Sequence, residues 1–121
     1  MKPTDLMIGD WVGVFDDKGI IKDCRQVDWI RTGEIGMRYQ KVWAIGCIEP
    51  IPLTAEILEK NGWWYDLDDI WLHDEVSFCI EKWNGKFQCY DISQIKLDSV
   101  HQLQHALRLC RLDELADNFK V

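Results

Sequence analysis

The sequence predicts an α+β fold with a β-rich N-terminal part, a short helix, a β-hairpin and a C-terminal helix packed on the sheet. Three observations lead to this prediction: short apolar runs separated by turn residues, an Asn-Gly pair between two alternating segments, and two helix-capping patterns. The chain has 121 residues, which is the length of one ordinary domain. We therefore expect a single domain over residues 1–121.

The segment 6–49 is predicted to form several short strands. Apolar and β-branched residues recur in it, and turn residues interrupt them at 16–19 and at Thr32-Gly33. Short strands at this spacing are typical of a small curled sheet or an SH3-like barrel. We expect one of these two forms for the β-rich part.

The segment 54–61 is predicted to be a short helix. Pro50 and Pro52 keep the preceding backbone extended, and Thr54 is a favourable N-cap residue. Asn61-Gly62 then supplies the left-handed residue with which helices commonly end.

The segment 76–92 carries the strongest local signal in the chain. Asn84-Gly85 predicts a two-residue type I′ turn, which places residue 83 opposite 86 and residue 80 opposite 89. One face of this hairpin is then apolar and belongs to the core, while the other face carries Trp83, Lys86 and Tyr90.

The segment 99–119 is predicted to be helical. Ser99 and Gln102 form a capping box, and Asp113 begins a last helical turn. The apolar stripe that we expect to pack on the sheet is Val100, Leu103, Ala106, Leu107 and Cys110.

Composition restricts the classes of partner. The formal net charge is −7, which disfavours binding to nucleic acid phosphates or anionic lipid. No apolar run approaches the length of a membrane span, and the N-terminus has no export signal. The five cysteines are odd in number and contain no CxxC pair, as expected for reduced thiols. We expect a cytoplasmic protein without a membrane partner.

Most of the net negative charge lies in one tryptophan-rich segment, 63–81, which holds six acidic residues and no Lys or Arg. Trp63, Trp64 and Tyr65 are consecutive, so they cannot all face inward on a regular element. We therefore predict an exposed acidic–aromatic surface that binds a protein partner or a second copy of the chain. The alternative is that these rings pack at the edge of a small sheet beside a solvent-exposed acidic loop. The predicted surface comprises Trp64, Tyr65, Asp66, Asp68, Asp69, Trp71 and Trp83.

Evidence for catalysis is weak. His101 and His105 have helical i,i+4 spacing and, with His73, are candidate ligands for a small metal-dependent hydrolase. The HExxH pattern is not met, and solvent-exposed histidines on a polar helix face are the alternative interpretation. No nucleophile motif or nucleotide-binding loop occurs, so we expect a non-enzymatic binding module without a cofactor.

A nucleic-acid-associated SH3-like module is a third hypothesis, in spite of the overall acidity. It requires the basic residues of the N-terminal part to gather on one face. These residues are Lys18, Lys22, Arg25, Arg31, Arg38 and Lys41.

Three blocks of the sequence resemble a family of small uncharacterised proteins from gut anaerobes and their prophages. The blocks are residues 5–12 (DLMIGDWV), 50–62 (PIPLTAEILEKNG) and 100–104 (VHQLQ). The resemblance implies a cytoplasmic protein associated with a mobile element, and it assigns no catalytic residue.

Overall fold

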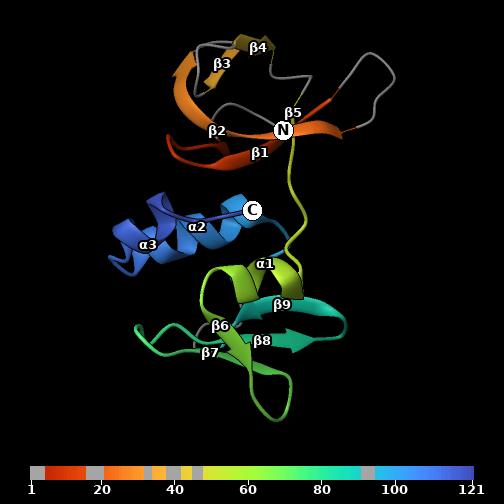
Figure 1. Cartoon of the computed structure of the whole chain (residues 1–121), viewed down its shortest axis with the longest axis vertical. Helices are drawn as coiled ribbons and strands as arrows, with labels where there is room; N and C mark the ends of the chain where they lie inside the picture. Colours follow the sequence, from red (N-terminus) through yellow and green to blue (C-terminus); the bar gives the residue numbers. More distant parts are fainter. Residues whose placement is uncertain (1–4, 16–20, 32–33, 38–41, 45–47, 91–94) are drawn as a thin grey trace. The chain divides into compact units, whose positions relative to one another are not determined.

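The computed structural model describes residues 5–15, 21–31, 34–37, 42–44, 48–90 and 95–121. Its antiparallel sheets and short helices confirm the predicted α+β class (Figure 1). The chain divides into two compact units, Met1–Ile51 and Pro52–Val121, and each is described by itself. The expectation of a single domain stays a prediction. No helix in the described ranges is long and apolar enough to cross a membrane.

The N-terminal unit is a five-stranded antiparallel sheet in the order β4-β3-β2-β1-β5. Its strands are β1 (Trp11–Phe15), β2 (Ile21–Arg31), β3 (Glu34–Met37), β4 (Val42–Ala44) and β5 (Ile48–Glu49). Strand β2 has 11 residues, and it pairs with β1 along its first half and with β3 along its second half. No pairing joins β4 to β5 within the described ranges. The predicted small sheet is confirmed, and the SH3-like barrel stays a prediction.

Period-two alternation explains the core of this unit. Val12 and Val14 lie on the same face of β1, on either side of Gly13, and both are buried. Gly36 lies directly beneath the ring of Trp29, where a Cβ atom would overlap the indole, so glycine is needed at this strand position. The buried cluster consists of Leu6, Val12, Val14, Val27, Ile35, Met37 and Ile48.

The C-terminal unit begins with the predicted short helix, α1 (Ala55–Lys60). The hydroxyl of Thr54 accepts a hydrogen bond from the backbone N–H of Ile57 at 3.3 Å, so Thr54 caps the helix as expected. Gly62 has a φ of +94°, and its N–H donates to the carbonyl of Glu59 at 3.2 Å. The left-handed helix end at Asn61-Gly62 is therefore confirmed.

Four antiparallel strands follow in the order β6-β7-β8-β9. They are β6 (Trp63–Tyr65), β7 (Ile70–His73), β8 (Ile80–Trp83) and β9 (Lys86–Cys89). The predicted register is confirmed, because Trp83 lies opposite Lys86 and Ile80 opposite Cys89. Asn84 and Gly85 have φ values of 52° and 77°, as a type I′ turn requires.

The β8–β9 hairpin is shorter than the predicted segment 76–92. Strand β8 begins at Ile80. Just before it, the carbonyl of Cys79 accepts from the N–H of Tyr90 at 3.0 Å, and the carbonyl of Phe78 accepts from the indole N–H of Trp63 at 3.0 Å. That carbonyl is therefore used by a side chain and not by strand pairing. Residues 91 and 92 lie outside the described ranges.

The C-terminal helical segment consists of α2 (Val100–Leu109) and α3 (Asp113–Asp117), which lie with α1 on one side of the four-stranded sheet (Figure 1). The side-chain oxygen of Gln102 accepts from the N–H of Ser99 at 3.1 Å. Val100, Leu103, Ala106 and Leu107 are buried as predicted. Cys110 is exposed, and its placement in the stripe was wrong because α2 ends one residue earlier.

Candidate interaction surface

The four-stranded sheet has two faces of different character. Residues that lie opposite each other in an antiparallel pair share a face, and successive residues along a strand alternate. The register therefore assigns Trp63, Trp71, Ile80, Phe87 and Cys89 to one face, and all five are buried. The opposite face, which we call the outer sheet face, carries Trp64, Ile70, Leu72, Glu81, Trp83, Lys86, Gln88 and Tyr90.

Three aromatic rings on the outer sheet face are substantially exposed. The exposed fraction is 42% for Trp64, 64% for Trp83 and 48% for Tyr90. Ile70 and Leu72 lie in the middle of this face and are partly exposed. A sheet face that is covered by helices on its reverse side and carries exposed rings on its front is suited to contact another macromolecule.

The seven residues of the predicted acidic–aromatic surface are not all in one place. Trp64 and Trp83 lie on the outer sheet face, and the acids of the predicted surface are exposed in the turn after β6. Tyr65 lies at the margin of the helix-covered face, where its ring contacts Trp71 at a centroid distance of 5.5 Å. The prediction for Trp71 was wrong: only 6% of it is exposed, because β7 alternates and turns this indole into the core.

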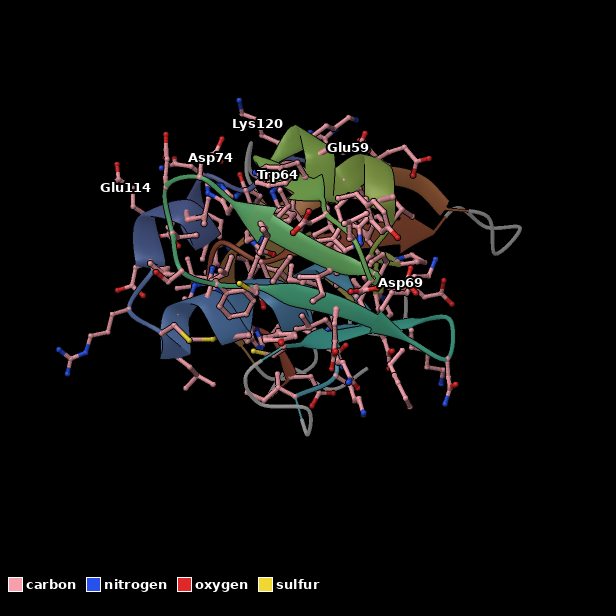
Figure 2. All side chains as sticks on the ribbon, turned by 90° about the horizontal axis from the view of Figure 1, so that it is seen from below. Glu59, Trp64, Asp69, Asp74, Glu114 and Lys120 are labelled. Atoms are coloured by element: carbon pink, nitrogen blue, oxygen red, sulfur yellow. The ribbon has the colours of Figure 1, made fainter. Side chains whose placement is uncertain are left out.

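The acidic segment is divided between two ends of the sheet, as Figure 2 shows for Asp69 and Asp74. Asp66, Asp68 and Asp69 form the β6–β7 turn, where Asp68 and Asp69 adopt left-handed φ values of 64° and 58°. Asp74 and Glu75 follow β7 at the other end. The six acids of this segment therefore do not form one continuous negative patch.

Each of these two acidic clusters holds an aromatic side chain by a hydrogen bond. The indole N–H of Trp64 donates to Oδ1 of Asp74 at 3.0 Å. The hydroxyl of Tyr65 donates to Oδ1 of Asp69 at 3.3 Å. These hydrogen bonds fix the orientations of the two rings at the surface.

A chain of polar side chains lies on the β8–β9 side of the outer sheet face. The ammonium of Lys96 donates to Oε1 of Gln88 at 2.8 Å, and Nε2 of Gln88 donates to Oε1 of Glu81 at 2.5 Å. Gln88 is itself buried, so its amide connects the exposed Lys96 with the half-buried Glu81. The predicted hairpin places Gln88 and Tyr90 on this face, whereas Ile70 and Leu72 are placed on it by the pairing of β7 with β8 and β6.

The histidines do not form a shared site. No group of three or more His, Cys, Asp or Glu side chains within the described ranges is arranged to hold a metal ion. Nδ1 of His73 accepts from the N–H of Glu75 at 3.1 Å, so its Nε2–H donates to the carbonyl of Asn61 at 2.9 Å. Both ring nitrogens of His73 are thus committed to the backbone, and its ring packs edge-on against Trp63 at 4.8 Å.

His101 and His105 are adjacent, with ring centroids 5.5 Å apart. The alternative that both are exposed to solvent was wrong for His101, which is buried and hydrogen-bonded through Nδ1 to the hydroxyl of Ser99 at 3.1 Å. The residue that precedes α2 therefore holds this imidazole in place. The metal-dependent hydrolase stays a prediction that no ligand cluster of the described chain supports.

The basic residues named for nucleic acid binding are only partly described. Arg25 forms an ion pair with Asp23 at 2.6 Å, which neutralises its charge locally. Lys18, Arg38 and Lys41, and the side chains of Lys22 and Arg31, lie outside the described residues. The nucleic acid hypothesis stays a prediction.

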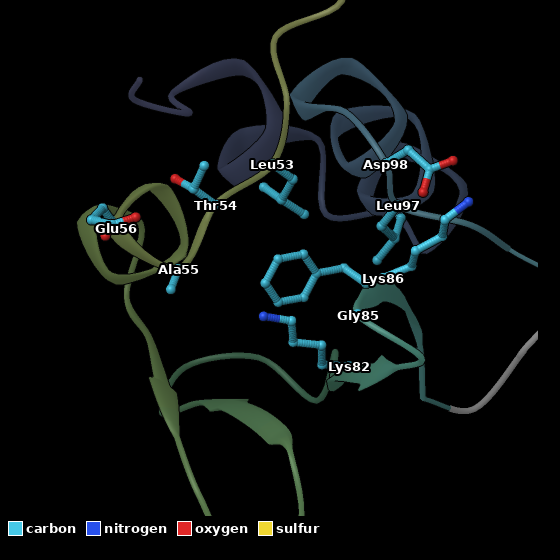
Figure 3. A pocket seen from close by; sticks show the side chains of 10 residues that line it. Leu53, Thr54, Ala55, Glu56, Lys82, Gly85, Lys86, Leu97 and Asp98 are labelled. Atoms are coloured by element: carbon cyan, nitrogen blue, oxygen red, sulfur yellow. The ribbon is translucent and has the colours of Figure 1, made fainter.

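A pocket of about 480 Å³ lies beside α1 and the β8–β9 hairpin (Figure 3). Its apolar lining includes Leu53 and Phe87, and the ammonium of Lys82 lies 5.5 Å from the centre of the Phe87 ring. Glu56 and Asp98 also line it, so charges of both signs face the same space. No single ligand chemistry follows from this lining. A second pocket of about 440 Å³ is lined by His73, whose ring nitrogens are already used.

Comparison of the chain with models of protein families, with curated proteins and with solved structures gives no match in any of the three. The resemblance to small prophage-associated proteins stays a prediction.

Proposed function

We propose that the chain is a non-enzymatic, cytoplasmic protein-binding module that contacts its partner with the outer sheet face. The single observation that carries this proposal is the set of three exposed rings, Trp64, Trp83 and Tyr90, on one face of a sheet whose other face is helix-covered. Tryptophan and tyrosine are the residue types most enriched among the side chains that dominate binding energy.

The proposal changes the surface that the sequence predicts. Tyr90, Ile70 and Leu72 join it, and Tyr65 and Trp71, which belong to the helix-covered face, leave it. The acids of the β6–β7 turn form one rim of the face. Charges at the rim of an interface affect the orientation and association rate of the partner more than the binding affinity. We also propose, from the resemblance to prophage-associated proteins, that the chain belongs to a mobile element, so its partner is sought in the cell that carries this element.

Affinity capture with matched surface variants tests this proposal. We expect the full chain to retain a partner protein from its native cells, and Trp83→Ser to lose it. Leu109→Ser is the control, because Leu109 is 78% exposed on α2 and lies on the opposite side of the unit. Retention of every partner by Trp83→Ser and by an Asp66→Lys, Asp68→Lys, Asp69→Lys triple variant would show that the outer sheet face is not the binding surface.

A further inference from the structure

We infer that the outer sheet face binds an extended segment of a partner protein that carries basic residues at positions i and i+4 and an apolar residue at i+2. This inference rests on the proposed function and names the chemistry of the partner. It is carried by two carboxylates on the β6–β7 half of the face, which lie at opposite ends of an apolar strip.

Alternation along β6 and β7 places Asp66 and Asp74 on the outer sheet face, and both are exposed. Asp66 comes two residues after Trp64, and its N–H donates to the carbonyl of Ile70 at 2.7 Å, so the hairpin pairing continues to this position. Asp74 comes two residues after Leu72, and its Oδ1 accepts from the indole N–H of Trp64 at 3.0 Å, which holds this carboxylate beside the ring. Both carboxylates therefore belong to the same surface as the exposed rings.

An apolar strip separates the two carboxylates. It consists of Ile70, Leu72 and the exposed ring of Trp64. Because Asp66 lies opposite Ile70 and Asp74 comes four residues later along the chain, the carboxylates are about 14 Å apart along the strands, at about 3.4 Å per residue. This half of the face thus presents an acid, an apolar strip and a second acid in order.

The charge of the β6–β7 half favours a basic partner. Residues 63–81 hold six acids and no Lys or Arg, so no base of this segment balances the two carboxylates. On the β8–β9 half, Lys96 donates to Gln88 at 2.8 Å, and Lys86 follows the hairpin turn and lines the pocket beside α1. A second copy of the chain carries the same net charge of −7, so it fits the β6–β7 half less well than a basic partner does.

The spacing of the two acids determines the form of the partner segment. Stacked strands are nearly aligned, so an extended segment follows the direction of β6 and β7. In such a segment the residues i, i+2 and i+4 point to one side, and the first and last of them are about 14 Å apart. Two arginines at i and i+4 then reach both carboxylates, while the residue at i+2 lies on Trp64 and Leu72. Arginine suits these contacts because its guanidinium can bond a carboxylate through two N–H groups.

An NMR titration of the isotope-labelled full chain with two peptides of the same composition tests the inference. Both peptides have blocked termini. SRTLTRS has its arginines at i and i+4, whereas STRLRTS has them at i and i+2, about 7 Å apart and too close to reach both acids. We expect SRTLTRS to shift the indole N–H signal of Trp64 and the amide signal of Leu72. Because so short a segment covers only part of the face, we expect a dissociation constant on the order of 1 mM. STRLRTS is expected to bind at least about threefold more weakly.

Matched variants assign the two contacts. Asp66→Asn and Asp74→Asn each remove one charge, and an asparagine amide oxygen can still accept from the indole of Trp64. We expect each variant to bind SRTLTRS about threefold more weakly than the wild type, and the double variant about tenfold more weakly. Asp113→Asn is the control, because it removes the same charge from an exposed position of α3, on the helix-covered side of the sheet. We expect it to bind as the wild type does.

Equal affinity for the two peptides would overturn the inference, as would a double variant that binds SRTLTRS as tightly as the wild type. Absence of any shift up to about 10 mM peptide, or shifts that spare Trp64 and Leu72, would also overturn it, given the expected affinity. So would a Trp64 signal that moves with protein concentration alone, because a second copy would then occupy the face.

The proposed function fails separately, when Trp83→Ser retains a captured partner. Loss of the partner by Trp83→Ser together with equal affinity for the two peptides would refute the basic segment and leave the outer sheet face as the binding surface.

Discussion

Replacing Gly62 by alanine is expected to destabilise the C-terminal unit more than an ordinary turn substitution does. Gly62 has a φ of +94°, and a Cβ atom built there would lie 2.5 Å from Nε2 of His73. That nitrogen donates to the carbonyl of Asn61 at 2.9 Å, so the added methyl group displaces the imidazole and breaks this hydrogen bond. The substitution thus disturbs the link between α1 and β7.

The magnitude follows from two contributions. Placing an L-residue in the left-handed region costs about 1–2 kcal/mol. Losing one hydrogen bond of a partly buried group costs about 1 kcal/mol more. We expect Gly62→Ala to lower the free energy of unfolding by about 2–3 kcal/mol, measured as a shift of the urea midpoint at an unchanged slope.

Gly85→Ala is the matched control. Gly85 also has a positive φ, +77°, but a Cβ atom there meets nothing within 4 Å. Its cost therefore isolates the backbone contribution of about 1–2 kcal/mol. Equal losses for the two variants would refute the argument that His73 is a structural side chain held between Asn61 and Glu75.

Two further predictions each compare two residues of the same type in different surroundings. Trp71→Phe should be at least about 1 kcal/mol less destabilising than Trp63→Phe in the same urea assay. The indole N–H of Trp71 is buried without an acceptor in the described chain, whereas that of Trp63 donates to a backbone carbonyl. Equal losses would contradict this assignment. Burial, with a smaller contribution from Asp23, raises the pKa of the Cys24 thiol, so at pH 8 Cys24 should be alkylated more slowly than the exposed Cys110, as peptide mass spectrometry of a labelling time course can show. Faster labelling at Cys24 would contradict it.

Local sequence signals predicted the local structure correctly. Asn84-Gly85 determines the register of its hairpin because two successive left-handed residues permit few other connections. Thr54 and Gln102 satisfy backbone N–H groups within one helical turn of themselves, so the helix starts follow from short-range chemistry. Neither signal depends on the rest of the fold.

The parts that the sequence could not predict depend on which strands pair with one another. The run Asp66–Asp69 has the composition of a loop, and its role as the turn of the β6–β7 hairpin appears only when β7 pairs with both β6 and β8. Trp71 and Trp64 have the same chemistry, and it is their register that puts one in the core and the other on the surface. The pairing of β6 with β7 also places the acids of the β6–β7 turn at one end of the sheet and Asp74 and Glu75 at the other.

In-cell photo-crosslinking tests the outer sheet face as an interaction surface most directly. The photo-reactive amino acid p-benzoylphenylalanine would be placed at Trp83, at Tyr90 and, as a control of comparable exposure, at Leu109. We predict a discrete crosslinked protein adduct from positions 83 and 90 and none from position 109, with twice the mass of the chain if the partner is a second copy. Adducts from position 109 with none from positions 83 and 90 would contradict the assignment of the outer sheet face.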